Sequence, residues 1–147
     1  MINYYNQDII FKLSDKRKIT KWISEAISEE NYFGKGVGEI SIVFTSDSYL
    51  RNINKKFLKK CYFTDIITFD NSTTDKISAD LIISVERVKI NSIRYKQSFK
   101  DEIHRVIIHG ILHLTGYNDE EDADKVDMTQ RENYYLNKRD WLDDKKI

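Results

Sequence analysis

Two histidines and a following aspartate are the residues of this sequence best suited to hold a metal ion. His109 and His113 lie four residues apart in an apolar segment. Residues at this spacing share one face of an α-helix, so their imidazoles can bind one ion together. Gly116 can end the helix and turn the chain, which allows the Asp119 carboxylate to supply a third ligand. A catalytic zinc ion commonly takes three protein ligands and keeps a fourth position for water. We therefore predict one zinc ion, or another divalent transition metal, bound by His109, His113 and Asp119.

The spacing matches the extended zinc-protease motif, H-E-x-x-H-x-x-G-x-x-H, with two changes. Gly110 stands where the proteases carry the glutamate general base, and Asp119 stands where they carry a third histidine. The first change argues against ordinary zinc proteolysis, whereas the second retains a zinc ligand. Gly110 either leaves room beside the metal for a bulky phosphate or lets the helix pack closely on a strand. A hydrogen-bonded pair of core histidines is the alternative interpretation of His109 and His113.

Three other polar residues of the same predicted helix lie close to the histidines. Glu102 and Arg105 share the helix face of His109, so either could hydrogen-bond a metal ligand. An ion pair between Glu102 and Arg105, three residues apart, is an equally reasonable interpretation. His104 lies about 140° around the helix from His109, and we expect it to be structural or exposed.

Apolar periodicity predicts the elements that position these residues. Alternating or β-branched apolar residues predict strands, and apolar stripes with a spacing of three and four predict helices. The second helix should direct Leu50, Ile53 and Phe57 inward, and Ser98 should cap the helix that carries the histidines. The predicted strands cover residues 9–13, 39–45, 66–69 and 79–85, and the predicted helices cover 19–27, 47–57, 86–95, 98–115 and 122–138. This order predicts an α+β fold, a small mixed β-sheet of about four strands packed with about five helices, including a zincin-like metal helix.

Composition limits the class of protein. The chain has 147 residues, of which 40% are hydrophobic and 33% are charged, so we expect a single soluble domain spanning 1–147. A membrane span needs about 20 consecutive apolar residues, and the sequence has no such run. The N-terminus lacks the features of a secretory signal, and Cys61 is the only cysteine. We expect a cytoplasmic protein without membrane contact, and we assume a monomer.

Charge is unevenly distributed along the chain. Residues 51–100 contain 11 Lys and Arg against 5 Asp and Glu, whereas residues 101–147 contain 7 against 12. A positive region of this kind suits contact with a polyanion, although the same charges could simply solvate surface helices.

The segment from His109 to Asp119 closely resembles the signature H-G-x-L-H-L-x-G-Y-D-H of the YbeY family, bacterial endoribonucleases also called rRNA maturation factors. Residues 64–69 resemble the family's T-[DN]-V-L-S-F strand, and residues 79–81 resemble its G-D-I strand. Residues 121–132, with Met128, resemble its final acidic helix.

The resemblance implies a zinc-dependent endoribonuclease that cuts single-stranded RNA. It also implies a role in maturing the 3′ end of the small-subunit ribosomal RNA and in ribosome quality control. The expected partners are then single-stranded RNA, ribosomal RNA and the small ribosomal subunit. By analogy with the family, Asp80 would lie on a strand near the site, which makes it a candidate general base; the alternative is that Asp80 is simply a charged residue at the start of a strand.

Three positions depart from the family pattern. Asp119 replaces the usual histidine and lowers the charge of the site by one, so a bound metal should be a weaker Lewis acid. Asn118 replaces an aspartate. Leu58 stands where the family has an arginine thought to contact substrate phosphate. The surrounding lysines could supply this charge to RNA as point charges, namely Lys55, Lys56, Lys59 and Lys60.

Two other functions remain open at this stage. The motif geometry is also that of a zincin-type metallopeptidase, although Gly110 opposes that function. The Leu58 departure favours a non-catalytic, ribosome-associated RNA-binding protein with a structural metal. A structural site would be recognised by a fourth protein ligand.

Overall fold

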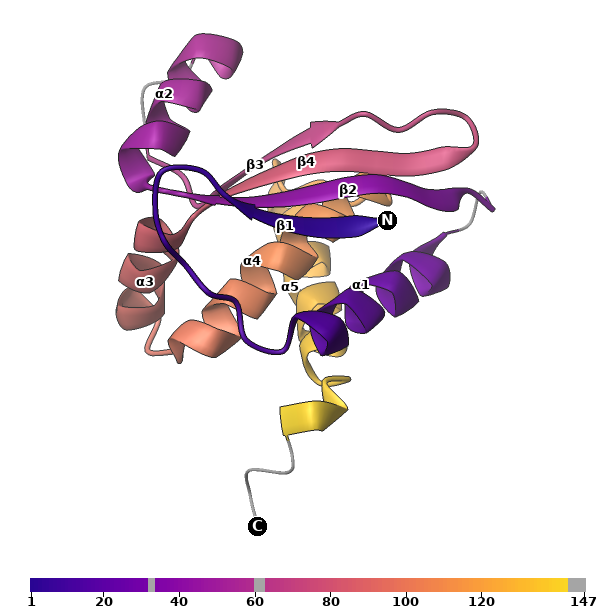
Figure 1. Ribbon diagram of the computed structural model, residues 1–147. Coiled ribbons are helices and arrows are strands. Elements are labelled where there is room, and N and C mark those ends of the chain that lie inside the picture. The colour runs from indigo at the N-terminus through magenta and orange to yellow at the C-terminus, as the bar shows by residue number, and fades with distance from the viewer. Residues whose placement is uncertain (32–33, 60–62, 143–147) are drawn as a thin grey trace.

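The computed structural model describes residues 1–31, 34–59 and 63–142, and within them it contains four strands and five helices. The strands form one mixed sheet in the order β1-β2-β4-β3, in which β1, β2 and β4 run parallel and β3 is antiparallel to β4 (Figure 1). The expected α+β fold is confirmed. In chain order the elements are β1 (Ile2–Asn6), α1 (Lys16–Glu30), β2 (Gly36–Thr45), α2 (Asp47–Leu58), β3 (Ile66–Asp70), β4 (Lys76–Ser84), α3 (Val85–Arg94), α4 (Phe99–Leu114) and α5 (Asp122–Leu136).

Helices α1, α3, α4 and α5 lie on one side of the sheet, and α2 lies on the other (Figure 1). The strands β2 and β4 place alternate residues in the core, as expected for period-2 side chains. The helix α4 is buried along most of its length. The core includes Ile40, Ile42, Phe44, Ala79, Leu81, Ile83, Ile103, Val106, Ile107, Ile111 and Leu112. No helix of the described residues is both long and apolar enough to cross a membrane.

The first strand differs from the prediction. It spans Ile2–Asn6 and pairs with β2, whereas residues 9–13 form no regular structure. Leu13 is buried and Phe11 stacks edge-on against Phe44 at 4.8 Å, while Ile10 is fully exposed. An irregular segment that covers the edge of the core therefore produces the same alternation of apolar residues as a strand.

The helix α2 also differs from the prediction in one residue. Its Leu50 is fully buried, but Phe57 is 58% exposed and does not reach the core. The Ser46 hydroxyl accepts a hydrogen bond from the Tyr49 amide and caps the start of the helix.

Gly110 allows α4 to pack directly on the sheet. A β-carbon at this position would lie 2.8 Å from both Ile66 Cδ1 and Leu81 Cδ2, closer than side chains approach one another. Of the two interpretations of Gly110, close packing against neighbouring strands is therefore confirmed. The contact fixes the distance between the histidine-bearing helix and β3.

Candidate metal centre

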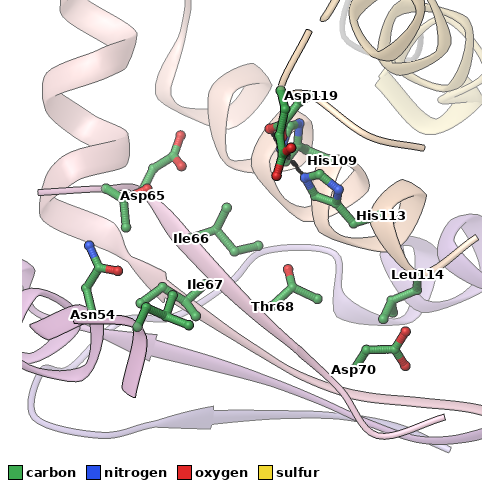
Figure 2. Close-up of a pocket in the computed structure, with 13 residues that line it drawn as sticks. Asn54, Asp65, Ile66, Ile67, Thr68, Asp70, His109, His113, Leu114 and Asp119 are labelled. Carbon is green, nitrogen blue, oxygen red and sulfur yellow. Dashed lines mark hydrogen bonds and ion pairs between the residues drawn. The ribbon is translucent and has the colours of Figure 1, made fainter. Parts of the chain in front are cut away.

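The end of α4 turns the chain back toward the histidines. The Gly116 amide donates to the His113 carbonyl, and the Tyr117 amide donates to the Leu112 carbonyl, at 3.2 and 3.1 Å. Together with the positive φ of Gly116, +113°, these bonds form the Schellman arrangement that ends many helices. The returning chain places Asp119 over His109 and His113, above β3 (Figure 2).

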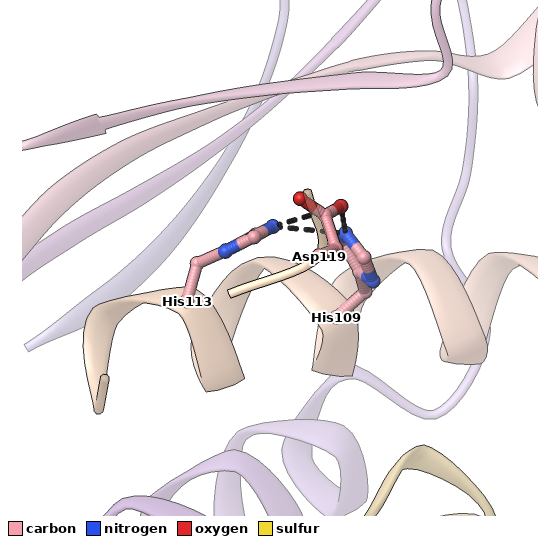
Figure 3. A group of neighbouring side chains, drawn as sticks. All are labelled: His109, His113 and Asp119. Carbon is pink, nitrogen blue, oxygen red and sulfur yellow. Dashed lines mark hydrogen bonds and ion pairs between the residues drawn. The ribbon is translucent and has the colours of Figure 1, made fainter. Parts of the chain in front are cut away.

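Three ligand atoms converge in this turn (Figure 3). The two Nε2 atoms of His109 and His113 lie 3.0 Å apart. The Asp119 Oδ2 atom lies 3.2 Å from His109 Nε2 and 3.4 Å from His113 Nε2. Ligands of a tetrahedral zinc ion, with bonds of about 2.0–2.1 Å, lie about 3.3 Å from one another. The three residues predicted from the sequence therefore have the spacing that a zinc ion requires.

The other nitrogen of each imidazole is held by an acceptor. His113 Nδ1 donates to the Tyr117 carbonyl oxygen at 2.9 Å. His109 Nδ1 donates to the Glu132 carboxylate at 2.6 Å. A neutral imidazole whose Nδ1 carries the proton has a lone pair on Nε2, so both rings direct a lone pair at the same point. The donor set thus fits a divalent cation.

Glu132, on α5, contacts a proposed ligand and was not predicted from the sequence. It is buried, and its second carboxylate oxygen accepts a hydrogen bond from Arg105 Nη1 at 2.8 Å. Burial lowers the pKa of the His109 imidazole, but the hydrogen bond and charge of Glu132 outweigh burial and raise that pKa above its usual value. Only the docking of α5 on α4 brings Glu132 to His109, and no local spacing signals that contact.

Arg105 and Glu102 lie near His109, as expected from the shared helix face, but within the described residues neither forms a hydrogen bond with a proposed ligand. Arg105 contacts Glu132 and Asn133 rather than a proposed metal ligand, so it acts on His109 through Glu132. Glu102 is buried beside the site, where burial raises the pKa of its carboxyl group. His104 is structural: it is buried, and its Nδ1 accepts a hydrogen bond from Arg139 at 2.8 Å.

A buried carboxylate supports the turn that carries Asp119. Glu30, at the end of α1, is 1% exposed and accepts a hydrogen bond from the Tyr117 hydroxyl at 3.0 Å. The Arg131 guanidinium and the Tyr135 hydroxyl also donate to Glu30. Because the Tyr117 carbonyl holds His113, this buried network links α1 and α5 to the orientation of a proposed ligand.

The three ligand atoms lie at a pocket of about 470 Å³ that runs along β3 between α2 and α4 (Figure 2). Leu58 forms part of its wall, so the position of the family arginine is apolar and faces the same pocket as the histidines. The side toward the pocket remains accessible. Among the residues that the structure describes, no fourth side chain joins His109, His113 and Asp119.

Asp65, but not Asp80, is among the carboxyl groups that line the pocket. Asp65 precedes β3 and lines both this pocket and a smaller one of about 270 Å³, each shared with His109 and Asp119. Burial raises the pKa of its carboxyl group. The tentative placement of Asp80 near the site was wrong. Leu81 faces α4, so the preceding Asp80 points to the opposite face of the sheet, where Asn71 Nδ2 donates to it at 3.1 Å.

The lysines predicted to contact RNA lie outside the pocket wall. Lys55, Lys56 and Lys59 are exposed at the end of α2, and none of them lines the pocket. Lys60 lies outside the described residues. The three described lysines are close in the chain to the pocket-lining Leu58 but form no part of the wall.

Comparison with known proteins gives a consistent result. A family model described as Endoribonuclease YbeY matches residues 1–140. A protein named Endoribonuclease YbeY from Karelsulcia muelleri is 46% identical over 136 residues, covering 92% of this chain and 94% of the relative. Its namesake from Porphyromonas gingivalis is 42% identical over 131 residues, covering 89% and 85%. A solution structure of a Thermotoga maritima protein matches the fold with a TM-score of 0.60 and 22% identity, covering 98% of this chain and 93% of that one.

Proposed function

The chain belongs to the YbeY endoribonuclease family, and we propose that it cuts single-stranded RNA with one zinc ion held by His109, His113 and Asp119. Metal-dependent RNA cleavage in rRNA processing is the activity that this membership supports. In the finer form of the proposal, the substrate is the maturing 3′ end of the small-subunit ribosomal RNA. The protein works on the small ribosomal subunit in the cytoplasm, where it also takes part in ribosome quality control.

The convergence of three ligand atoms is the main support for the proposal. Two Nε2 atoms and one carboxylate oxygen converge within 3.0–3.4 Å at the wall of an accessible pocket. A divalent ion bound there supplies positive charge for the phosphoryl oxygens and lowers the pKa of a coordinated water. The carboxylate ligand favours zinc less strongly than a third histidine would, which leaves manganese and nickel as the other metals to test.

Groups around the centre would orient the imidazoles, transfer a proton and attract the RNA. Glu132 and the Tyr117 carbonyl hold the two imidazoles in the tautomer that binds a cation. Asp65 lies at the same pocket, where it can accept the proton of the attacking hydroxyl group and return it to the leaving oxygen. The exposed lysines at the end of α2 attract the RNA backbone.

The two alternative functions are not favoured. A zinc peptidase of this type needs a glutamate at position 110, and the close contacts of Gly110 with Ile66 and Leu81 leave no room even for a β-carbon. A structural metal would require a fourth protein ligand, and the described residues provide three.

The test combines metal analysis with cleavage of RNA. Purified protein should contain about one divalent ion per chain, and it should cut a single-stranded RNA faster than the same sequence in a duplex. His113→Ala and Asp119→Asn should lose both the ion and the cleavage. Asp127→Asn, an exposed aspartate on α5, is the matched control and should retain both. Full cleavage by His113→Ala would show that the activity belongs to a contaminant.

A further inference from the structure

Two exposed phenylalanines lie next to the proposed metal pocket. Phe57 is 58% exposed at the end of α2, and Phe63 is 47% exposed just before β3. Each is the chain neighbour of a pocket-lining residue, Leu58 and Thr64 respectively. Leu58 is itself 44% exposed. The two exposed rings therefore lie next to the pocket wall in the chain, and Leu58 belongs both to that wall and to the exposed apolar residues.

Cationic side chains surround both rings. The Arg51 and Arg87 guanidiniums lie 5.1 and 4.8 Å from the centroid of the Phe63 ring. The Lys56 ammonium lies 5.3 Å from the centroid of the Phe57 ring. These distances allow cation–π attraction, which orients the rings while leaving them accessible. We call this surface the aromatic rim, and it consists of Arg51, Lys56, Phe57, Leu58, Phe63 and Arg87.

The rim is anchored at both ends. Arg87 donates from Nη2 to Asp47 Oδ2 at 2.7 Å and from Nε to Asp47 Oδ1 at 3.3 Å, so its guanidinium cannot swing freely. Phe57 packs edge-on against Phe69 of β3, with 6.0 Å between the ring centroids. Arg51 precedes Leu58 by seven residues, two helical turns, so it shares the face of α2 that lines the pocket.

We propose that the aromatic rim binds unpaired bases of the RNA, which stack on Phe57 and Phe63 while the backbone passes between the rim cations toward the metal pocket. The inference rests on the proposed function and names the surface that selects single strands. Every base has a face that can stack on an aromatic ring, but a base within a duplex has its faces covered by neighbouring pairs. The rim therefore favours single strands without reading their sequence.

The composition of the rim favours RNA over a protein partner. Each of its two rings has at least one cation beside it, and it lies within the stretch of the chain that has a large excess of Lys and Arg. Protein interfaces are typically depleted of lysine, whereas this surface contains Lys56 and is next in the chain to the exposed Lys55 and Lys59. Aromatic rings with cations beside them suit the bases and phosphates of a single strand.

The test measures binding separately from cleavage. His113→Ala serves as the background so that RNA is not cut, and the fluorescence anisotropy of a labelled single-stranded oligonucleotide reports affinity. Phe57→Ala and Phe63→Ala should each weaken binding about 5-fold or more, as expected for the loss of one stacked base. Phe57→Trp should retain the affinity, and the added indole fluorescence should be quenched on binding. Tyr5→Ala removes an exposed aromatic ring from the opposite edge strand and should have no effect.

Salt dependence distinguishes stacking from charge. Phe57→Ala should shift the binding curve without changing its slope against salt concentration, whereas Arg51→Gln should flatten that slope. The proposal is overturned if both alanine variants bind single strands as tightly as the background protein does. Binding of a protein to the aromatic rim would not rescue it. If the wild-type protein neither binds nor cuts RNA, the proposed function itself is wrong. If the wild-type protein cuts RNA normally and both alanine variants bind RNA normally, the proposal for the aromatic rim is wrong but the proposed function stands.

Discussion

The Tyr117 hydroxyl donates a hydrogen bond to the buried Glu30 carboxylate at 3.0 Å, although the two residues lie 87 positions apart in the chain. The backbone carbonyl of the same tyrosine accepts from His113 Nδ1. One residue thus connects the end of α1 to a proposed metal ligand.

Tyr117→Phe should weaken metal binding, because the turn loses its attachment to Glu30 while the carbonyl remains. Outer partners of metal ligands typically change affinity 10- to 100-fold, and we expect the lower end, about 10-fold, for this indirect contact. Competition with a chromophoric chelator measures the affinity. Tyr134→Phe, which changes a more exposed tyrosine on α5, should leave it unchanged. Equal affinities of the two variants would contradict the link.

Glu132→Gln should weaken metal binding more strongly than Tyr117→Phe. The variant loses the charge that holds His109 and also leaves Arg105 without its ion pair. We expect a loss of about 10- to 100-fold in the same chelator assay. Glu121→Gln, an exposed glutamate at the start of α5, is the matched control. If Glu132→Gln binds metal normally, the carboxylate serves only to join α4 to α5.

Asp65→Asn should reduce cleavage while the metal remains bound. Loss of a general acid or base typically costs 10²- to 10⁴-fold in rate, and the amide of asparagine cannot replace the carboxyl. The rate under single-turnover conditions and the metal content of the same sample separate the two effects. Asp80→Asn, on the opposite face of the sheet, should cut at the normal rate. A fully active Asp65→Asn enzyme would exclude Asp65 from proton transfer.

His104 should make the folded state sensitive to acid. Burial, assisted by the charge of Arg139, lowers the pKa of His104 from 6.5 to about 4. As the pH falls, the unfolded chain therefore binds a proton at His104 before the folded chain does. The resulting loss of folding free energy is absent above pH 6.5 and grows as the pH falls toward 4. The loss of folding free energy due to His104 is about 3 kcal/mol at most. Urea unfolding of wild type and His104→Gln at pH 7.5 and pH 4.5 measures the difference. Identical changes with pH in both proteins would refute the prediction.

Leu58→Arg should strengthen RNA binding, because it adds a guanidinium to the wall of the pocket. Leu58 is 44% exposed, so the longer side chain needs no rearrangement of the core. One added phosphate contact with a single strand should steepen the salt dependence of binding by about 0.7 in the logarithmic plot. Ile93→Arg adds the same charge at an exposed position of α3 and gives the baseline. Equal slopes for the two variants would show that position 58 does not meet a phosphate.

The sequence predicted that the three proposed ligands would come together, because their arrangement is local. His109 and His113 are placed by helical periodicity, and Asp119 is placed by the glycine that ends the helix, all within eleven residues. The partners of these ligands are not local. Glu132 and Glu30 reach the centre only through the packing of α5 and α1, which no spacing in the sequence encodes.

The errors have similar causes. The alternation of residues 9–13 was interpreted as a strand, because an irregular segment that covers the core also alternates its contacts. Phe57 was assigned to the core from its spacing with Leu50 and Ile53, but it lies near the end of α2, where one edge of its ring meets Phe69 and the rest is exposed to solvent. Asp80 was placed by analogy, and the pleat of β4 directs it to the other face.

Because Asp119 lies outside α4, a bound ion would connect two different parts of the chain. His109 and His113 belong to a rigid helix, whereas Asp119 belongs to the segment that joins α4 to α5. An ion bound by all three residues would hold that segment against α4 and restrain the start of α5. Since only the folded chain brings the three atoms together, binding would stabilise the whole domain by an amount that grows with the logarithm of the free ion concentration.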